Sequence, residues 1–188
     1  MLVRVATAVK DQAVRERSKL ERFEESILPH LAAAYNLARW LTRDGRDAED
    51  MVQEAYLRAF RFFEGFRGGD GRAWLLTIVR NTCYTWLQQN RSREFIALDD
   101  EIDKVESDLR SPEEILIATN DNELLERALD ELPLEFREVI ILRELEGMSY
   151  KEIAGLADIP LGTVMSRLAR ARKRLQQAIA EVMPERLE

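Results

Sequence analysis

In several segments of the chain, apolar residues recur at steps of three and four positions, the spacing that places them on one side of an α-helix. The predicted helices cover residues 20–42, 47–64, 72–90, 113–132 and 135–145. Pro133 and Gly147 end the last two, because proline removes a helical hydrogen bond and glycine tolerates the left-handed turn that follows many helices. No stretch alternates apolar and polar residues for long enough to predict a sheet. The pattern therefore predicts an all-α fold.

Residues 149–175 predict two further short helices joined by a tight turn. Ser149 and Glu152 have the spacing of a capping box, which starts the first helix, and Pro160 prevents that helix from continuing. The second helix has an apolar side of Val164, Leu168, Ala171 and Leu175, and a polar side of Thr163, Ser166, Arg167, Arg170 and Arg174. Residues 161–174 hold five basic residues and no acidic one. This pattern is typical of a helix-turn-helix that enters the major groove of DNA, although a helical hairpin with a solvated cationic face has it too.

The charge pattern divides the chain into two helical domains around an acidic connector. Residues 94–114 carry nine acidic and two basic residues, whereas residues 66–93 carry five basic residues and one acidic residue. The predicted boundaries are an N-terminal arm at 1–18, a first domain at 19–91, an acidic flexible linker at 92–112 and a second domain at 113–188. The net charge of −7 opposes the approach of phosphates, so we expect binding to DNA to depend on a partner.

The residue inventory argues against an enzyme. One histidine and one cysteine cannot build a zinc site or a Cys–His nucleophile pair, so we expect no catalytic residue, metal or cofactor. The glycine-rich residues 65–71 follow a helical pattern and lack the lysine of a phosphate-binding loop. No apolar run approaches the roughly 20 residues of a membrane span, so membrane insertion is not expected. The lone Cys83 suits a reducing cytoplasm and is expected to be a small buried side chain on a helix.

Three blocks of sequence resemble the bacterial sigma-70 family, and in particular its extracytoplasmic-function (ECF, group 4) subfamily. Residues 47–60, DAEDMVQEAYLRAF, resemble the polymerase-binding helix of that family. Residues 66–87, FRGGDGRAWLLTIVRNTCYTWL, resemble the segment that melts and reads the −10 element, and residues 129–175 resemble the domain that reads the −35 element. The resemblance implies a region 2-like bundle, a region 4-like helix-turn-helix domain and the function of a promoter-specificity subunit of RNA polymerase.

The first block supplies the predicted polymerase-binding residues, which lie off the apolar side of their helix. They are Asp47, Glu49, Asp50, Gln53 and Glu54. Taken alone, they favour a solvated acidic face with pairs such as Glu54 and Arg58 one turn apart over a binding surface, and the resemblance reverses that preference. The resemblance implies that this face docks on the clamp helices of the largest polymerase subunit. It also implies a contact with the flap of the second-largest subunit and regulation by an anti-sigma factor.

The second block combines aromatic, amide and cationic side chains, which suit single-stranded DNA. Its predicted −10 residues are Phe66, Arg72, Trp74, Thr77, Arg80, Asn81 and Tyr84. Trp74 and Phe66 are also good candidates for packing against another helix. The resemblance implies that Asn81 captures a base extruded from the −10 element.

The third block supplies the predicted −35 contacts Thr163, Ser166, Arg167, Arg170 and Arg174. The resemblance implies that residues 162–174 enter the major groove, with Ser166 and Arg170 at positions used for bases or phosphates. Met165 and Ala169 depart from residues common in the family and should change the promoter sequence that is read. Two alternatives remain: a dimeric helix-turn-helix regulator that binds duplex DNA without polymerase, and an adaptor that binds only protein.

Overall fold

The computed structural model describes residues 17–97 and 120–182, with side chains described for 17–90 and 125–180. Every regular element in these ranges is helical, which confirms the all-α prediction. Most of the predicted arm and most of the predicted linker lie outside the described residues. We call residues 17–97 the N-terminal unit and residues 120–182 the C-terminal unit.

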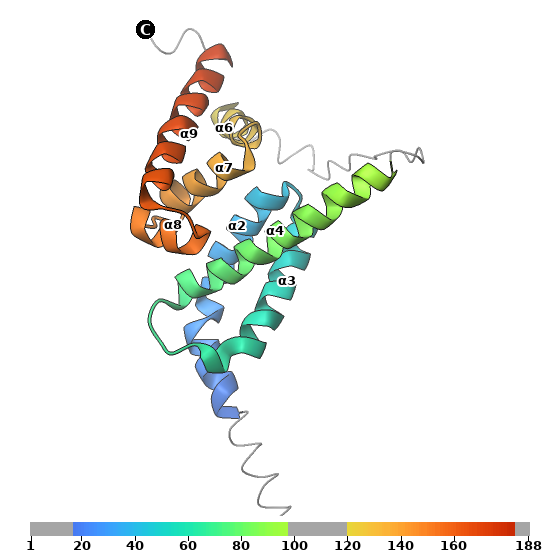
Figure 1. Cartoon of the computed structure of the whole chain (residues 1–188), viewed down its shortest axis with the longest axis vertical. Coiled ribbons are helices and arrows are strands. Elements are labelled where there is room, and N and C mark those ends of the chain that lie inside the picture. Colours follow the sequence, from blue (N-terminus) through green and yellow to red (C-terminus); the bar gives the residue numbers. More distant parts are fainter. Residues whose placement is uncertain (1–16, 98–119, 183–188) are drawn as a thin grey trace, which may run out of the picture.

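The N-terminal unit is a helical bundle that ends in one long helix (Figure 1). Its elements are a helical segment at 17–26, η1 (Leu28–His30), α2 (Leu31–Thr42), α3 (Gly45–Phe62), η2 (Phe63–Gly65) and α4 (Gly71–Ala97). The helices α2, α3 and α4 all pack against one another. Ala55, Leu75 and Val79 are fully buried, as the apolar spacing predicts, and Leu37 of α2 is fully buried with them.

The single helix predicted over residues 20–42 is wrong in one respect: it is broken at residues 27–30. Pro29 lies in the short η1 turn, and a proline nitrogen has no hydrogen to donate to a preceding helical carbonyl. The chain resumes as α2 at Leu31. The break lets Ile27 turn fully into the core, where its neighbour Phe23 meets the rings of Phe60 and Phe63 edge to face.

Aspartates start the next two helices of this unit. The carboxylate of Asp44 accepts from the backbone nitrogens of Arg46 and Asp47, at 2.7 and 3.0 Å. The carboxylate of Asp70 accepts from the backbone nitrogens of Arg72 and Ala73 at 2.9 and 3.1 Å and so caps α4. The helix α4 extends to Ala97, beyond the predicted end at residue 90.

Gly71 has a steric role at the start of α4. A β-carbon at this position would lie 2.4 Å from the backbone oxygen of Ser26 and 3.4 Å from the side chain of Ile27. Only glycine allows the first turn of α4 to approach the segment 17–26 this closely.

The C-terminal unit consists of α6 (Asn120–Asp130), α7 (Leu134–Ile140), η3 (Ile141–Leu145), α8 (Tyr150–Ala157) and α9 (Leu161–Val182). The start of the helix predicted at 113–132 lies outside the described residues. The helix predicted at 135–145 begins as α7 but ends in the single wide turn η3, where the backbone nitrogen of Glu146 donates to the oxygen of Ile141 at 3.0 Å. Gly147 follows with a φ of +64°, the left-handed conformation expected there.

The helix-turn-helix predicted from residues 149–175 is confirmed as α8 and α9. Ser149 and Glu152 form the capping box. The backbone nitrogen of Glu152 donates to Oγ of Ser149 at 3.3 Å, and the backbone nitrogen of Ser149 donates to Oε2 of Glu152 at 2.6 Å. Asp158 adopts a left-handed φ of +54° and ends α8. The apolar residues Val164 and Leu168 of α9 are buried, as predicted.

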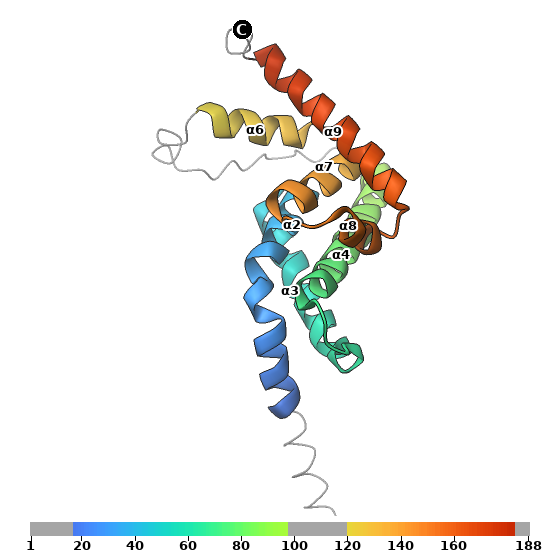
Figure 2. The same cartoon turned by 90° about the vertical axis from the view of Figure 1, so that its left-hand side faces the viewer.

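The two units contact each other directly (Figures 1 and 2). The helix α8 packs against α4, and α7 packs against α2. The long helix α4 therefore has the N-terminal bundle on one side and the C-terminal unit on another. Within the described ranges, no helix is both long and apolar enough to cross a membrane.

Candidate nucleic-acid and protein interfaces

The acidic side of α3 faces away from the core. Glu49, Asp50 and Gln53 are exposed, whereas Asp47 and Glu54 are half-buried. Glu54 accepts from Nε of Arg58 at 2.6 Å, so the pair expected for a solvated helix face does form. The face nevertheless leaves Glu49, Asp50 and Gln53 available together.

Negative charge is crowded at the start of this face. Burial raises the pKa of the Asp47 carboxyl above its ordinary value, and the charges of Asp44 and Asp50 raise it further. A cationic partner that approaches such a surface relieves the repulsion between the carboxylates, so its binding is favourable.

Leu57 belongs to the same side of α3 and was not among the predicted residues. Its side chain is 65% exposed, one turn beyond Gln53 and Glu54. The signal was present in the sequence, because Leu57 does not fit the spacing of the buried apolar side of its helix.

The predicted −10 residues, which lie on α4 and in the loop before it, divide into three groups. Asn81 is exposed, and its amide oxygen accepts from Nη1 of Arg80 at 3.3 Å. The hydroxyl of Thr77 donates to the oxygen of Ala73 in its own helix at 2.8 Å and is half-buried. Of the predicted set, Asn81 is therefore the residue whose side chain points most freely into solvent.

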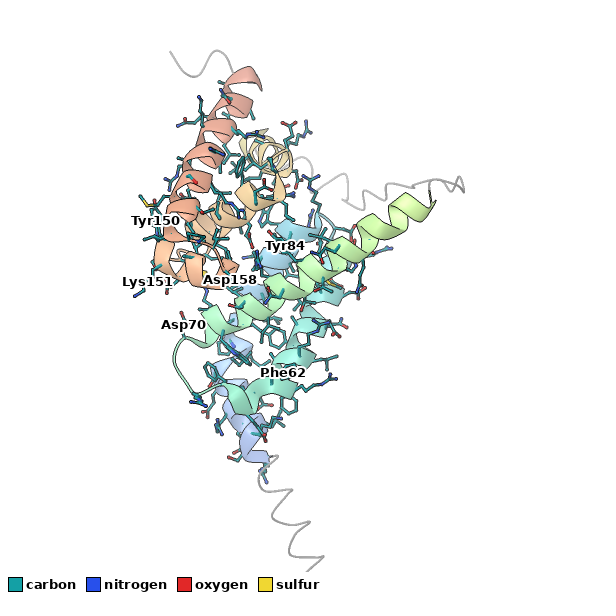
Figure 3. All side chains as sticks on the ribbon, viewed as in Figure 1. Phe62, Asp70, Tyr84, Tyr150, Lys151 and Asp158 are labelled. Carbon is teal, nitrogen blue, oxygen red and sulfur yellow. The ribbon has the colours of Figure 1, made fainter. Side chains whose placement is uncertain are left out.

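Phe66 and Trp74 form the second group, an aromatic cluster with Phe63. The ring centroids of Phe66 and Trp74 are 5.0 Å apart, and those of Phe63 and Phe66 are 5.7 Å apart. Both Phe66 and Trp74 are half-buried and pack against the bundle. This agrees with the interpretation of the two residues as packing residues. The cluster holds the loop before α4, whose last residue Asp70 is marked in Figure 3, against the N-terminal unit.

Arg72, Arg80 and Tyr84 form the third group, and their partners come from the C-terminal unit. Nε of Arg80 lies 2.5 Å from Oε1 of Glu138, and the hydroxyl of Tyr84 donates to Oε2 of the same carboxylate at 2.9 Å. Arg72 forms an ion pair with Glu146. Tyr84 lies on the part of α4 that passes the C-terminal unit (Figure 3).

The electrostatics of this third group follow from burial and from Glu138. Burial by itself would lower the pKa of Arg80, but the hydrogen bond and the charge of Glu138 outweigh it, and the pKa is raised. Burial and the nearby Glu138 carboxylate both raise the pKa of Tyr84. Arg80 therefore remains a cation and Tyr84 a hydrogen-bond donor at any physiological pH.

The predicted −35 residues lie along α9. Ser166, Arg170 and Arg174 are exposed, whereas Thr163 and Arg167 are half-buried. The hydroxyl of Ser166 donates to the oxygen of Thr163 at 3.0 Å, and the guanidinium of Arg174 lies 5.2 Å from the centre of the Phe136 ring. Arg170 is thus presented to solvent, while Arg174 rests against its own unit.

Arg172, which was not predicted as a contact, serves the C-terminal unit itself. Its Nη2 lies 2.7 Å from Oε1 of Glu144.

A separate groove of about 410 Å³ opens beside this pair, between α6, η3 and α9. Its apolar lining includes Leu129, Ile141, Leu175 and Ile179, and Leu145 at its edge is 55% exposed. Among the described residues, no cluster of acidic, histidine and cysteine side chains could hold a metal ion.

Comparison with known proteins identifies the family. The model of sigma-70 region 2 matches residues 27–93, and the model of sigma-70 region 4 matches residues 122–175. The ECF RNA polymerase sigma factor SigE of Mycolicibacterium smegmatis is 33% identical over 175 residues, which cover 93% of this chain and 68% of that protein. The chain belongs to the ECF sigma factors.

Further similarities extend over nearly the whole sigma factor. The ECF RNA polymerase sigma-E factor of Haemophilus influenzae is 32% identical over 193 residues, which cover 95% of this chain and 100% of that protein. The sigma factor RpoE of Bartonella quintana, solved in complex with the anti-sigma factor NepR, superposes with a TM-score of 0.71 at 31% identity, covering 85% of this chain and 97% of that one. CnrH, solved with the cytosolic domain of CnrY, shares the fold with a TM-score of 0.63 at 22% identity, covering 90% and 94% of the two chains.

Proposed function

We propose that this ECF sigma factor, as the promoter-specificity subunit of bacterial RNA polymerase, distributes its three tasks over α3, α4 and α9. The observation that carries the proposal is the joint match to sigma-70 regions 2 and 4, in the family's order, on one chain. The helix α3 binds core polymerase, α4 engages the −10 element, and α9 reads the −35 element. The domain boundaries at 19–91 and 113–188 remain part of this proposal.

Two surfaces are available for polymerase. The exposed Glu49, Asp50 and Gln53 on α3 suit the clamp helices of the largest subunit, because carboxylates and amides complement basic and polar partners. Leu57 adds apolar area to that surface. The groove between α6, η3 and α9 suits an apolar helix from the flap of the second-largest subunit.

DNA recognition is proposed to use binding energy alone, with no covalent chemistry. Ser166 and Arg170 on α9 face solvent as a major-groove helix requires, and Arg167 can hold a phosphate. On α4, the exposed Asn81 is the residue assigned to an extruded −10 base. Phe66, Trp74 and Thr77 support α4 and its loop, and they complete the −10 surface where their exposed edges reach it.

A protein partner that restrains the sigma factor is also proposed. Its support is the similarity to the Bartonella RpoE, which was solved with an anti-sigma factor bound. The proposed site of action is the bacterial cytoplasm, where core polymerase and promoters lie. The alternative of a dimeric regulator that needs no polymerase is not favoured, because the SigE, sigma-E and RpoE relatives described above are each named as sigma factors.

In vitro transcription tests the proposed function. Core polymerase and a promoter library should yield specific transcripts only when the purified chain is added, and sequencing their start sites would define the −10 and −35 elements. Selective, tight binding of duplex DNA by the chain alone, together with no effect on core polymerase, would contradict the proposal and favour the regulator.

A further inference from the structure

The cations predicted to hold −10 DNA are already paired in the free protein. We propose that the C-terminal unit is an internal competitor for the −10 face: Glu138 and Glu146 hold Arg80 and Arg72 in the free chain, and promoter DNA replaces them once polymerase separates the two units. We call these two ion pairs, with Tyr84, the inter-unit cluster. The inference rests on the proposed role of α4 in −10 binding.

Glu138 is a buried carboxylate of the C-terminal unit whose hydrogen bonds come from the N-terminal unit. Its side chain is 0% exposed, and the side chains that donate to it, Arg80 and Tyr84, both belong to α4. On a separated C-terminal unit the carboxylate would lose both donors. A buried carboxylate without partners is strongly disfavoured, so separation must bring Glu138 into water. The docked state is thus a defined second arrangement of the chain.

Glu146 makes a matching contact nearer the start of α4. Its side chain is 5% exposed, and that of Arg72 is 32% exposed. Nδ2 of Asn36 also lies 3.5 Å from Oε1 of Glu146. Glu138 lies within α7 and Glu146 directly follows η3. They engage α4 at Arg80 and Arg72, which were both predicted as −10 contacts.

The chemistry of these pairs favours exchange over permanent closure. Burying an ion pair costs desolvation energy that largely offsets its attraction, so the closed arrangement is held only marginally by its charges. A DNA phosphate offers arginine the same acceptor oxygens as a carboxylate and remains partly solvated. Phosphate can therefore replace glutamate without leaving either arginine unpaired.

The closed arrangement affects one DNA-binding face and spares the other. On the −35 face, Ser166 and Arg170 of α9 stay exposed. On the −10 face, Asn81 stays exposed, but Arg72, Arg80 and Tyr84 are engaged by the glutamates. The competition therefore acts on −10 engagement, whereas the −35 helix remains accessible.

The test compares the full-length wild type with the double variant E138Q/E146Q. The matched control is E131Q/E135Q, which removes the same charge from exposed positions of the same unit. Small-angle scattering reports whether the units separate, and fluorescence anisotropy measures affinity for a fluorescein-labelled single-stranded oligonucleotide of randomised sequence. We expect the double variant alone to have a larger radius of gyration. If less than a fifth of the free wild-type molecules are open, the double variant should bind the oligonucleotide at least about fivefold more tightly than the control.

Equal radii and equal affinities for the double variant and the control, with both folded, would overturn the proposal. Thermal unfolding followed by circular dichroism checks the fold. If E138Q destabilises the C-terminal unit, E146Q alone carries the test, because the Glu146 side chain is the more exposed of the two. All these variants should still support transcription with core polymerase. Failure of the wild type in that assay would contradict the proposed function, whereas the scattering and binding measurements need no polymerase.

Discussion

At the scale of single residues, burial determines what the side chains of α4 can do. Cys83 is fully buried between α4 and its neighbours, as expected for the one cysteine of the chain. Burial raises the pKa of its thiol to about 12. The thiolate, which is the reactive form, is therefore almost absent near neutral pH.

Cys83 should react very slowly with Ellman's reagent in the folded protein. At pH 8 the raised pKa alone lowers the thiolate population, and with it the rate, by about three powers of ten relative to a free thiol. The same sample in concentrated urea provides the control and should react at the rate of an exposed cysteine. Rapid reaction without denaturant would mean that α4 opens readily.

Gly71→Ala should destabilise the N-terminal unit. The new β-carbon would meet the Ser26 oxygen at 2.4 Å, and overpacking of this kind costs about 1–3 kcal/mol in the free energy of unfolding. Gly65→Ala is the control, because a β-carbon there would have no neighbour within 4 Å, and it should change stability by less than about 0.5 kcal/mol. Urea unfolding monitored by tryptophan fluorescence measures both. Equal stabilities would show that the segment 17–26 yields at no cost.

At the scale of elements, each of the three functional helices buries one side and presents another. The helix α3 buries Ala48, Val52, Ala55 and Ala59, small residues that bring its backbone close to the core, and presents its acidic side to solvent. The helix α9 buries Val164, Leu168 and Ala171 and presents Ser166 and Arg170. Changes on the presented sides should therefore affect binding without unfolding the unit.

Asp50→Arg should weaken association with core polymerase by about tenfold or more, because it places a like charge against a cationic partner. The substitution is at an exposed position, so the thermal unfolding curve should not change. Glu64→Arg, which is exposed in η2 outside the α3 face, is the control with the same charge change. Competition with a labelled sigma factor for core polymerase measures the affinity of both variants. An equal loss for the two variants would mean that net charge, and not this face, governs binding.

Arg170→Ala should lower transcription from promoters that depend on the −35 element by about 5- to 150-fold, equivalent to about 1–3 kcal/mol if the guanidinium reads a base. Lys173→Ala is the matched control on the same helix, since Lys173 is exposed and was not predicted as a −35 contact. In vitro transcription from intact and altered −35 elements measures the difference. Similar losses for both variants would argue against a specific role for Arg170.

At the scale of the whole molecule, the two units must part before the −10 face is free. Strand separation then depends on both units being placed on polymerase, with α9 holding duplex DNA while α4 binds an unpaired base. Asn81 is the residue of α4 whose exposure already suits that second step.

Asn81→Ala should impair open-complex formation about tenfold or more while leaving closed-complex binding nearly unchanged, since one hydrogen-bonded base contact is worth about 1–3 kcal/mol. Thr85→Ala, one turn further along the exposed side of α4, is the control. Permanganate reactivity of −10 thymines reports the open complex, and low-temperature gel shifts report the closed complex. An equal loss in both complexes would remove the base-capture role.

Much of the fold was predictable because its determinants are local. Helix starts at Asp70 and Ser149 depend on hydrogen bonds to groups two or three residues away, and the buried sides of α3, α4 and α9 follow from spacing along one helix. The break at Pro29 was also local, and it was missed because the apolar pattern continues across it. The polar side of α4 was identified for the same reason, although spacing could not separate the packed Trp74 from the exposed Asn81.

The sequence by itself determined the helices, their capping, the sigma-70 family and the residue types offered on α3, α4 and α9. Only the tertiary structure decided that Glu138 and Glu146 meet Arg80 and Arg72, which lie 58 and 74 positions away in the chain. It also decided that Gly71 must lack a side chain. Such contacts depend on how whole helices are oriented, and no short-range spacing encodes that orientation, because many arrangements satisfy the same pattern of buried and exposed residues.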